Sequence, residues 1–110
     1  MKRIKNKVQL IGHVGMDHEV KNLNNKKRVR ISLATSDYYK DANGNKVEDT
    51  QWHNLIAWGN IASVAEQYLK KGNKVAIEGK LTHRSFKKNG NKQFITEVVV
   101  NELLILTKKF

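Results

Sequence analysis

Cysteine and proline are both absent from this sequence of 110 residues. Without cysteine, the chain forms neither disulfide bonds nor thiolate metal sites. Without proline, and with no linker, low-complexity tract or internal repeat, nothing in the sequence marks a boundary between domains. We therefore expect residues 1–110 to form one domain with one modest core, which is also what the length favours.

Long apolar runs are missing as well. No stretch approaches the roughly 18 apolar residues that a membrane-spanning helix needs. The basic start, MKRIKNKVQLIGHVG, lacks the apolar segment of a signal peptide. These absences predict a cytoplasmic protein that is not inserted in a membrane.

Acidic residues are scarce: ten Asp and Glu stand against 21 Lys and Arg, which leaves a net charge of +11. Such an excess costs self-repulsion, and proteins that tolerate it commonly bind polyanions. Nucleic acid is the first partner to consider and an anionic membrane surface the second. A protein that is merely basic is the plainest alternative.

Residues that could carry catalysis or hold a metal ion are not grouped in this sequence. The four histidines show no ligand spacing, and GNKVAIEGKL lacks both the glycine spacing and the Ser or Thr of a phosphate loop. Several acidic residues crowd a polar stretch around Asp41, where solvation explains them. Because no nucleophile can be paired with a base, we expect no enzymatic activity, no catalytic residue, no metal site and no cofactor.

Alternating apolar and polar residues predict five strands, in KVQLIGHVG, RVRISLATS, QWHNLIAWG, KVAIEGKLTHRSF and QFITEVVV. Gly79 inside the fourth predicts a bulge or a sharp bend. YYKDANGNKVEDT, between the second and third, predicts a long hairpin loop, because Asn43 and Gly44 adopt positive φ easily. The stretch from about Asp17 to Lys27 is polar, interrupted by Val20 and Leu23, and none of the five predicted strands lies in it.

The segment NIASVAEQYLKKG has the period of a helix instead. Its apolar residues form one predicted stripe: Ile61, Val64, Ala65, Tyr68 and Leu69. Five strands with one short helix between the third and fourth predict an all-β chain with an OB-fold, a partly open five-stranded Greek-key barrel. Strand periodicity by itself also allows other small barrels.

Both tryptophans of the chain lie in QWHNLIAWG. Trp52 and Trp58 have the same parity, so they project from one face of a strand. Taken alone, the segment favours burial of that face, because it is the more apolar of the two. Neighbouring segments favour an exposed platform, since Phe86 shares a face with Arg84 and Tyr39 is followed by a lysine.

Aromatic rings beside cations suit single-stranded nucleic acid. Every base offers a flat π-face on which a ring can stack, and every linkage carries a negative phosphate. Lysine and arginine then add a salt-sensitive attraction that is blind to base sequence. A duplex hides its base faces, so the same surface selects for the unpaired strand.

Over nearly its whole length, the chain resembles the DNA-binding domain of bacterial single-stranded DNA-binding proteins (SSBs). The matching blocks are NKVQLIGHVGMDHEVK, ISLATSDYYKD, TQWHNLIAWG, AEQYLKKGNKVAIEGKL and TEVVVNEL. The resemblance implies sequence-independent binding and protection of single-stranded DNA in replication, recombination and repair. It also implies a nucleoid location and a homotetramer.

The resemblance assigns roles to individual residues. Base stacking falls on the aromatic residues Tyr39, Trp52, Trp58 and Phe86, two of which stand where tryptophan is common. Phosphate contacts fall on Lys7, Lys71, Arg84 and Arg3. His53 aligns with a histidine at the subunit interface, although a histidine bonded within its own chain fits as well.

Three matters stay open from the sequence. SSBs commonly continue into a flexible linker and an acidic tip that recruits replication and repair proteins, whereas this sequence ends LTKKF. Recruitment of such partners is therefore not assigned. An RNA-binding OB-fold protein fits the charge and aromatics nearly as well, and a primosomal OB-fold protein with a protein ligand is the third possibility.

Overall fold

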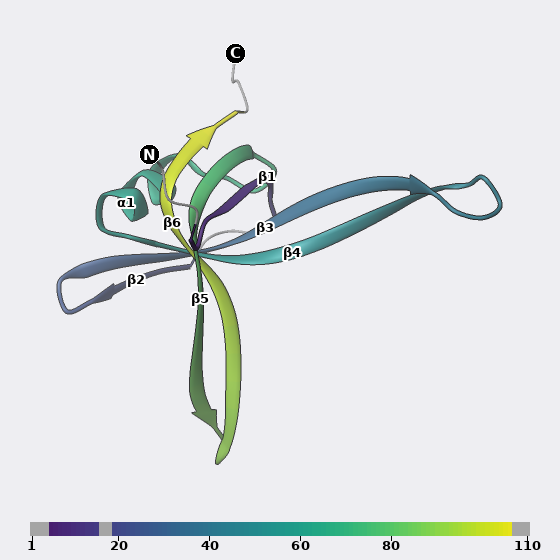
Figure 1. Cartoon of the computed structure of the whole chain (residues 1–110). Helices are drawn as coiled ribbons and strands as arrows, with labels where there is room; N and C mark the ends of the chain where they lie inside the picture. Colours follow the sequence, from purple (N-terminus) through teal and green to yellow (C-terminus); the bar gives the residue numbers. More distant parts are fainter. Residues whose placement is uncertain (1–4, 16–18, 107–110) are drawn as a thin grey trace.

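The computed structural model describes residues 5–15 and 19–106. Within them lie six strands and one helix (Figure 1): β1 (Val8–Val14), β2 (Glu19–Leu23), β3 (Lys26–Lys40), β4 (Lys46–Trp58), α1 (Gly59–Tyr68), β5 (Lys74–Lys88) and β6 (Asn91–Ile105). The strands form one sheet in the order β1-β5-β6-β4-β3-β2, which closes on itself through a further pairing of β1 with β3. Only two residue pairs make this closure, so the barrel is partly open.

The strand count is one higher than predicted, because β2 pairs with the start of β3. In β2 only Val20, opposite Val29, packs against the core; its neighbours are polar or charged and exposed. The other apolar residue of β2, Leu23, is exposed and lies three positions along, on the opposite face, so the strand has no alternating pattern. Asn24 and Asn25, both at positive φ, make the tight turn that joins the two strands.

The predicted long loop between β3 and β4 is wrong. The two strands stay paired as far as Lys40 opposite Lys46, and the turn is confined to 41–45. There the carboxylate of Asp41 accepts the backbone N–H groups of Asn43 and Asn45, each at 2.9 Å. Both faces of this ribbon meet water, so its residues need not alternate, which is why sequence periodicity missed it.

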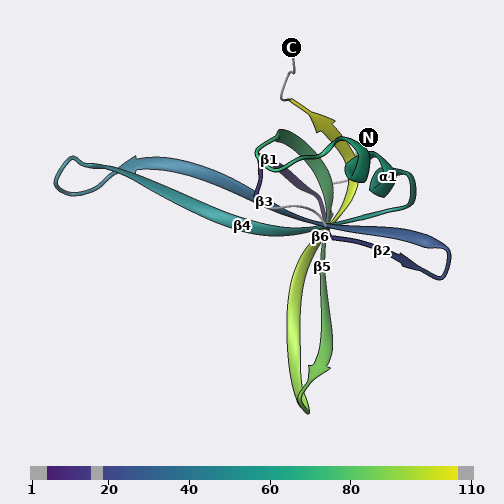
Figure 2. The ribbon, with the colours of Figure 1, turned by 180° about the vertical axis from the view of Figure 1, so that it is seen from behind.

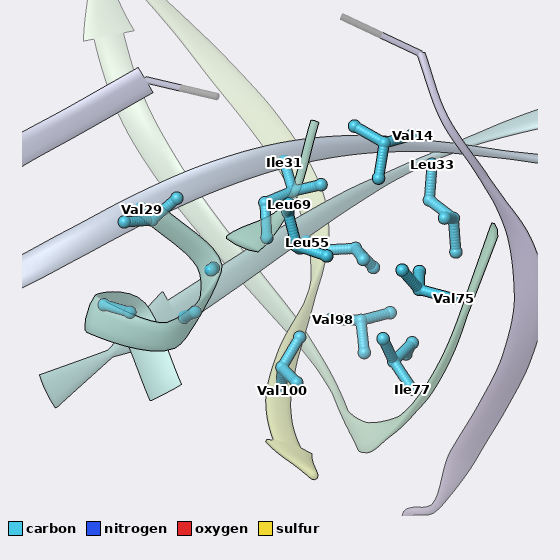
Figure 3. Close-up of a cluster of buried hydrophobic side chains, with 13 residues drawn as sticks. Val14, Val29, Ile31, Leu33, Leu55, Leu69, Val75, Ile77, Val98 and Val100 are labelled. Atoms are coloured by element: carbon cyan, nitrogen blue, oxygen red, sulfur yellow. The ribbon is translucent and has the colours of Figure 1, made fainter. Parts of the chain in front are cut away.

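The core lies where the strands cross (Figure 3). Alternate residues of β3, β4, β5 and β6 meet there, among them Val29, Ile31, Leu33, Leu55, Val75, Ile77, Val98 and Val100. Each such side chain contributes about 1.5–3 kcal/mol by leaving water. The predicted bulge at Gly79 is confirmed: the β5–β6 register shifts there, and a Cβ would lie 2.2 Å from the carbonyl oxygen of Val99.

Helix α1 packs mainly against β3 and β4 at one end of the barrel. Its predicted apolar stripe is partly wrong, because Ala62 and Ala65 are buried whereas Val64 and Tyr68 are exposed. Small side chains let the helix approach the sheet closely, and Leu69 completes the contact just after its end. The helical structure in the described ranges has neither the length nor the apolar character of a membrane span.

The β3–β4 and β5–β6 hairpins, together with the shorter β2–β3 hairpin, run out from the barrel and give the molecule its extended outline in both views (Figures 1 and 2). We call residues 36–50 the β3–β4 arm and residues 80–96 the β5–β6 arm. Buried side chains become rare where each arm begins, and the arms are mostly exposed along their length. Each arm is thus a two-stranded ribbon with both faces exposed to solvent.

Candidate nucleic-acid interface

One continuous face of β3, β4, β6 and β5 points away from the core. Residues opposite each other in a ladder project from the same side, and the pairing sets Trp58 against Arg28 and Trp52 against Ala34. The β4–β6 and β5–β6 pairings show which residues of β6 and β5 project from this same side of the sheet. We call it the outer face; its charged and aromatic members include Arg28, Arg30, Trp52, Trp58, Arg84, Phe86 and Glu97.

Both tryptophans lie at the surface of this face. Trp52 is 59% exposed and Trp58 36% exposed, whereas Leu55 and Ala57, on the other side of β4, are buried. The expectation of a buried tryptophan face, taken from the segment alone, is therefore wrong. Apolar character did not decide which side turns inward; the pairing of β4 with β3 and β6 did, because it closes the barrel over Leu55 and Ala57.

The indole of Trp52 is held in place from beneath. It lies against Gly15, at the end of β1, so closely that a Cβ there would sit 2.0 Å from its Cζ3 atom. Any side chain at Gly15 would displace the ring. The ring is thus supported by backbone on one side and still has most of its surface in water, which is the arrangement of a stacking platform.

Cations stand beside the aromatic rings of the outer face. The Lys26 ammonium lies 6.0 Å from the centre of the Trp58 ring, and the Arg84 guanidinium lies 6.0 Å from the centre of the Phe86 ring. These separations are at the limit of a cation–π contact. A base stacked on either ring would therefore have a cation close to its phosphate.

Glu97 joins the strands of this face from below. It is 4% exposed, and its carboxylate accepts hydrogen bonds from Arg84 at 2.8 and 3.2 Å and from Arg30 at 3.3 Å. The hydrogen bonds from Arg84 to Glu97, with a smaller Coulombic attraction, raise the pKa of Arg84 against the opposing effect of desolvation. Two guanidinium groups thus share one carboxylate, which leaves a net positive charge between the rings.

Arg30 and Glu97 were missed in the sequence. The parity of Arg30 within RVRISLATS was visible, but only its pairing opposite Ile56 shows that it shares the side of the tryptophans. Glu97 offered no signal, because a lone acid in a strand is usually solvent-exposed.

The two adjacent tyrosines fall on different faces of the β3–β4 arm, and each is more than half exposed. Tyr38 is on the outer face, opposite Glu48, while Tyr39 is on the other side, opposite Val47. The Tyr38 hydroxyl donates to Glu48 at 2.6 Å and Lys46 lies 4.4 Å from the ring centre. The structure therefore does not place Tyr39 on the face that carries Trp52, and it places Tyr38 there instead.

The predicted phosphate-binding residues are spread over the barrel and the β5–β6 arm. Arg84 lies on the outer face, and Lys7, just before β1, pairs with Glu78 at 3.2 Å. Lys71 is exposed in the turn after α1, and that turn bonds to β1 through the Gly72 N–H and the Val14 carbonyl. This is the end of β1 that supports Trp52. Arg3 lies outside the described residues.

His53 lies on the core side of β4, opposite Leu33, and its Nε2 is 2.9 Å from the hydroxyl of Thr35. This contact fits the alternative in which His53 is hydrogen-bonded within its own chain. In the described ranges, no three His, Asp or Glu side chains are grouped in a way that could hold a metal ion.

Comparison with known proteins agrees with this geometry. The model of the single-strand binding protein family matches residues 5–106. The chain belongs to this family. Its members are DNA-binding proteins and are not enzymes as a class.

Similar proteins cover almost the whole chain. The single-stranded DNA-binding protein 1 of Chlorobaculum tepidum is 45% identical over 99% of this chain and 69% of its own length. The protein of the same name from Xylella fastidiosa is 39% identical over 94% of this chain and 79% of its own.

A solved structure of the Plasmodium falciparum SSB in complex with single-stranded DNA superposes with a TM-score of 0.84. It is 32% identical and covers 97% of this chain and 99% of that one. This similarity confirms the predicted OB-fold.

Proposed function

We propose that this protein binds single-stranded DNA without sequence preference and protects it during replication, recombination and repair. One observation carries the proposal: Trp52 and Trp58 are exposed on the same face, with Lys26 beside Trp58, in a member of the single-strand binding protein family. Stacking contributes about 1–3 kcal/mol per base and reads no base edge. The protein acts by binding the open strand in preference to the duplex, with no reaction catalysed, and we place it on the nucleoid in the cytoplasm.

The strand contacts come from both arms and from the barrel between them. Base stacking falls on Trp52, Trp58 and Phe86 of the outer face, and on Tyr39 across the β3–β4 arm. Because that arm is a narrow ribbon, a strand that crosses its edge meets both of its faces. Phosphate contacts fall on Lys7, Lys71, Arg84 and Arg3.

Tryptophan fluorescence during titration with poly(dT) tests the proposal. Both tryptophans of the chain are on the outer face, so the emission reports on that face alone. We expect strong quenching, weaker binding at high salt, and much weaker binding of a matched duplex. Each of Trp52→Ala and Trp58→Ala should weaken binding about 5- to 150-fold, which corresponds to 1–3 kcal/mol.

Tyr68→Ala is the matched control, because Tyr68 is an exposed ring on α1 and not on the outer face. It should bind like the wild type. Equal affinity for duplex and single strand, or a clear preference for RNA over DNA of the same sequence, would overturn the proposal.

We further propose a homotetramer. The outward side of β1, β5 and β6 carries an apolar row formed by Ile11, Ala76 and Leu104, in which Ile11 is 60% and Leu104 62% exposed. The row borders an open hollow of about 750 Å³, and an exposed apolar row of this kind is typical of a contact surface. His53 is proposed to lie at a second contact between subunits. Analytical ultracentrifugation should show four chains per particle, and a monomer at micromolar concentration would refute this.

A further inference from the structure

The β5–β6 arm has a second face that the proposed interface does not use. Register pairs Arg84 with Ile95 and Phe86 with Gln93 on the outer face, so the residues between them project the other way. We call this other side the back face of the arm. Its members are His83, Ser85 and Lys87 from β5 and Lys92, Phe94 and Thr96 from β6.

Phe94 is the most exposed large apolar side chain in the described part of the molecule, at 74%. The Lys92 ammonium lies 5.4 Å from the centre of its ring, within cation–π reach. The back face therefore repeats the pairing of an aromatic ring with a cation that Phe86 and Arg84 make on the outer face. Directly opposite Phe94 stands Ser85, whose side chain is small.

Charge identifies the kind of partner that suits this face. Residues 80–96 contain five cations, Lys80, Arg84, Lys87, Lys88 and Lys92, and no aspartate or glutamate. A second copy of this chain, itself at +11, meets like charge along the whole arm. A polyanion with flat rings meets complementary charge and a ring to stack on.

We propose that Lys92 and Phe94 form a second contact for single-stranded DNA on the back face, so that one strand passes over both sides of the β5–β6 arm. This rests on the proposed function and extends it. The arm projects from the barrel in both views (Figures 1 and 2), and within the described residues its side chains are mostly exposed on both faces. A base stacks on Phe94, and Lys92 contacts a phosphate beside it.

The test is binding of oligo(dT) of increasing length to the full chain and to two matched variants. Phe86→Ala should weaken binding at every length, because it removes a ring of the outer face. Phe94→Ala should bind short oligomers like the wild type and lose about 5- to 150-fold only for oligomers long enough to reach the back face. Lys92→Ala should lower the slope of log affinity against log salt by about 0.7, for long oligomers only.

Phe94→Leu separates stacking from bulk, because it keeps an apolar side chain and removes the π-face. It should behave like Phe94→Ala, whereas Phe94→Tyr should bind like the wild type. If Phe94→Ala matches the wild type at every length while Phe86→Ala does not, the back face carries no contact and the proposed function still stands. If Phe94→Ala changes the particle mass and not DNA binding, the face joins protein chains. If the wild type binds no oligomer, both proposals fall.

Discussion

Strand β3 contributes side chains to the core along its first half and exposes its side chains along its second half. In the first half of β3, Val29, Ile31 and Leu33 are buried at alternate positions; a few residues later, Tyr38 and Tyr39 are both exposed. The ladder with β4 runs through both halves without a break. Backbone pairing is therefore the same in barrel and arm, and what differs is whether another layer covers the side chains.

The difference separates two tasks. In the barrel, side chains are selected by volume, because close-packed interiors tolerate neither gaps nor overlap. In the described structure the side chains of the arms are mostly exposed and free to contact a ligand. Both arms carry aromatic and cationic residues, although the β3–β4 arm also holds four acidic residues, Asp37, Asp41, Glu48 and Asp49. The stability of the fold should therefore depend on the barrel, and the affinity for single-stranded DNA on the arms and the outer face.

The largest effect is expected in the barrel. Leu55→Ala should lower the free energy of unfolding by about 2–5 kcal/mol, since it leaves a cavity in the core. Trp52, three residues earlier, is exposed, and Trp52→Ala should change that free energy by less than about 1 kcal/mol while weakening DNA binding. Urea denaturation of both variants measures this. Equal losses would show that the tryptophans are part of the core.

Glu97 lies where the barrel meets the β5–β6 arm. Its replacement should therefore lower the stability of the fold and raise the affinity for single-stranded DNA. Glu97→Gln should lower unfolding stability by about 1.5–3 kcal/mol, because two arginines lose a charged acceptor. It should also tighten DNA binding at low salt and steepen the salt slope by up to about 0.7, since one more guanidinium charge is left for phosphate.

Glu66→Gln is the control for Glu97→Gln: Glu66 pairs with Lys27 at the edge of α1, and its loss should cost about 1 kcal/mol or less. Urea denaturation and salt-dependent titration measure both properties. Weaker binding by Glu97→Gln would mean that Glu97 positions the arginines more than it neutralises them.

The smallest effect is expected at the exposed end of the β3–β4 arm. The hydrogen bond to Glu48, with its charge, raises the pKa of Tyr38 above 10.0. The stabilisation from this contact is complete below the pKa of the unfolded phenol and is lost as pH rises through the higher folded pKa. Glu48→Gln should bring the pKa of Tyr38 down toward its ordinary value. An absorbance titration compares the two proteins, and identical curves would contradict this.

The sequence by itself determined which residues share a face, and with that much of the fold. Period-two alternation predicted the barrel strands, the helical period predicted α1, and Gly79 predicted the bulge. Trp52 and Trp58 were correctly placed on the same side of β4. These features depend on neighbours in the chain, and such local information is present in any single segment.

Tertiary structure alone decided which face turns inward and where pairing ends. A lone strand does not distinguish its two sides. The tryptophans are exposed because β4 pairs with β3 and β6 in a way that turns the other side of β4 inward. The length of the β3–β4 arm, the separation of Tyr38 from Tyr39 and the burial of Glu97 between two arginines depend on the same register. Register is set by hydrogen bonds between residues distant in the sequence, and no periodicity along one strand contains it.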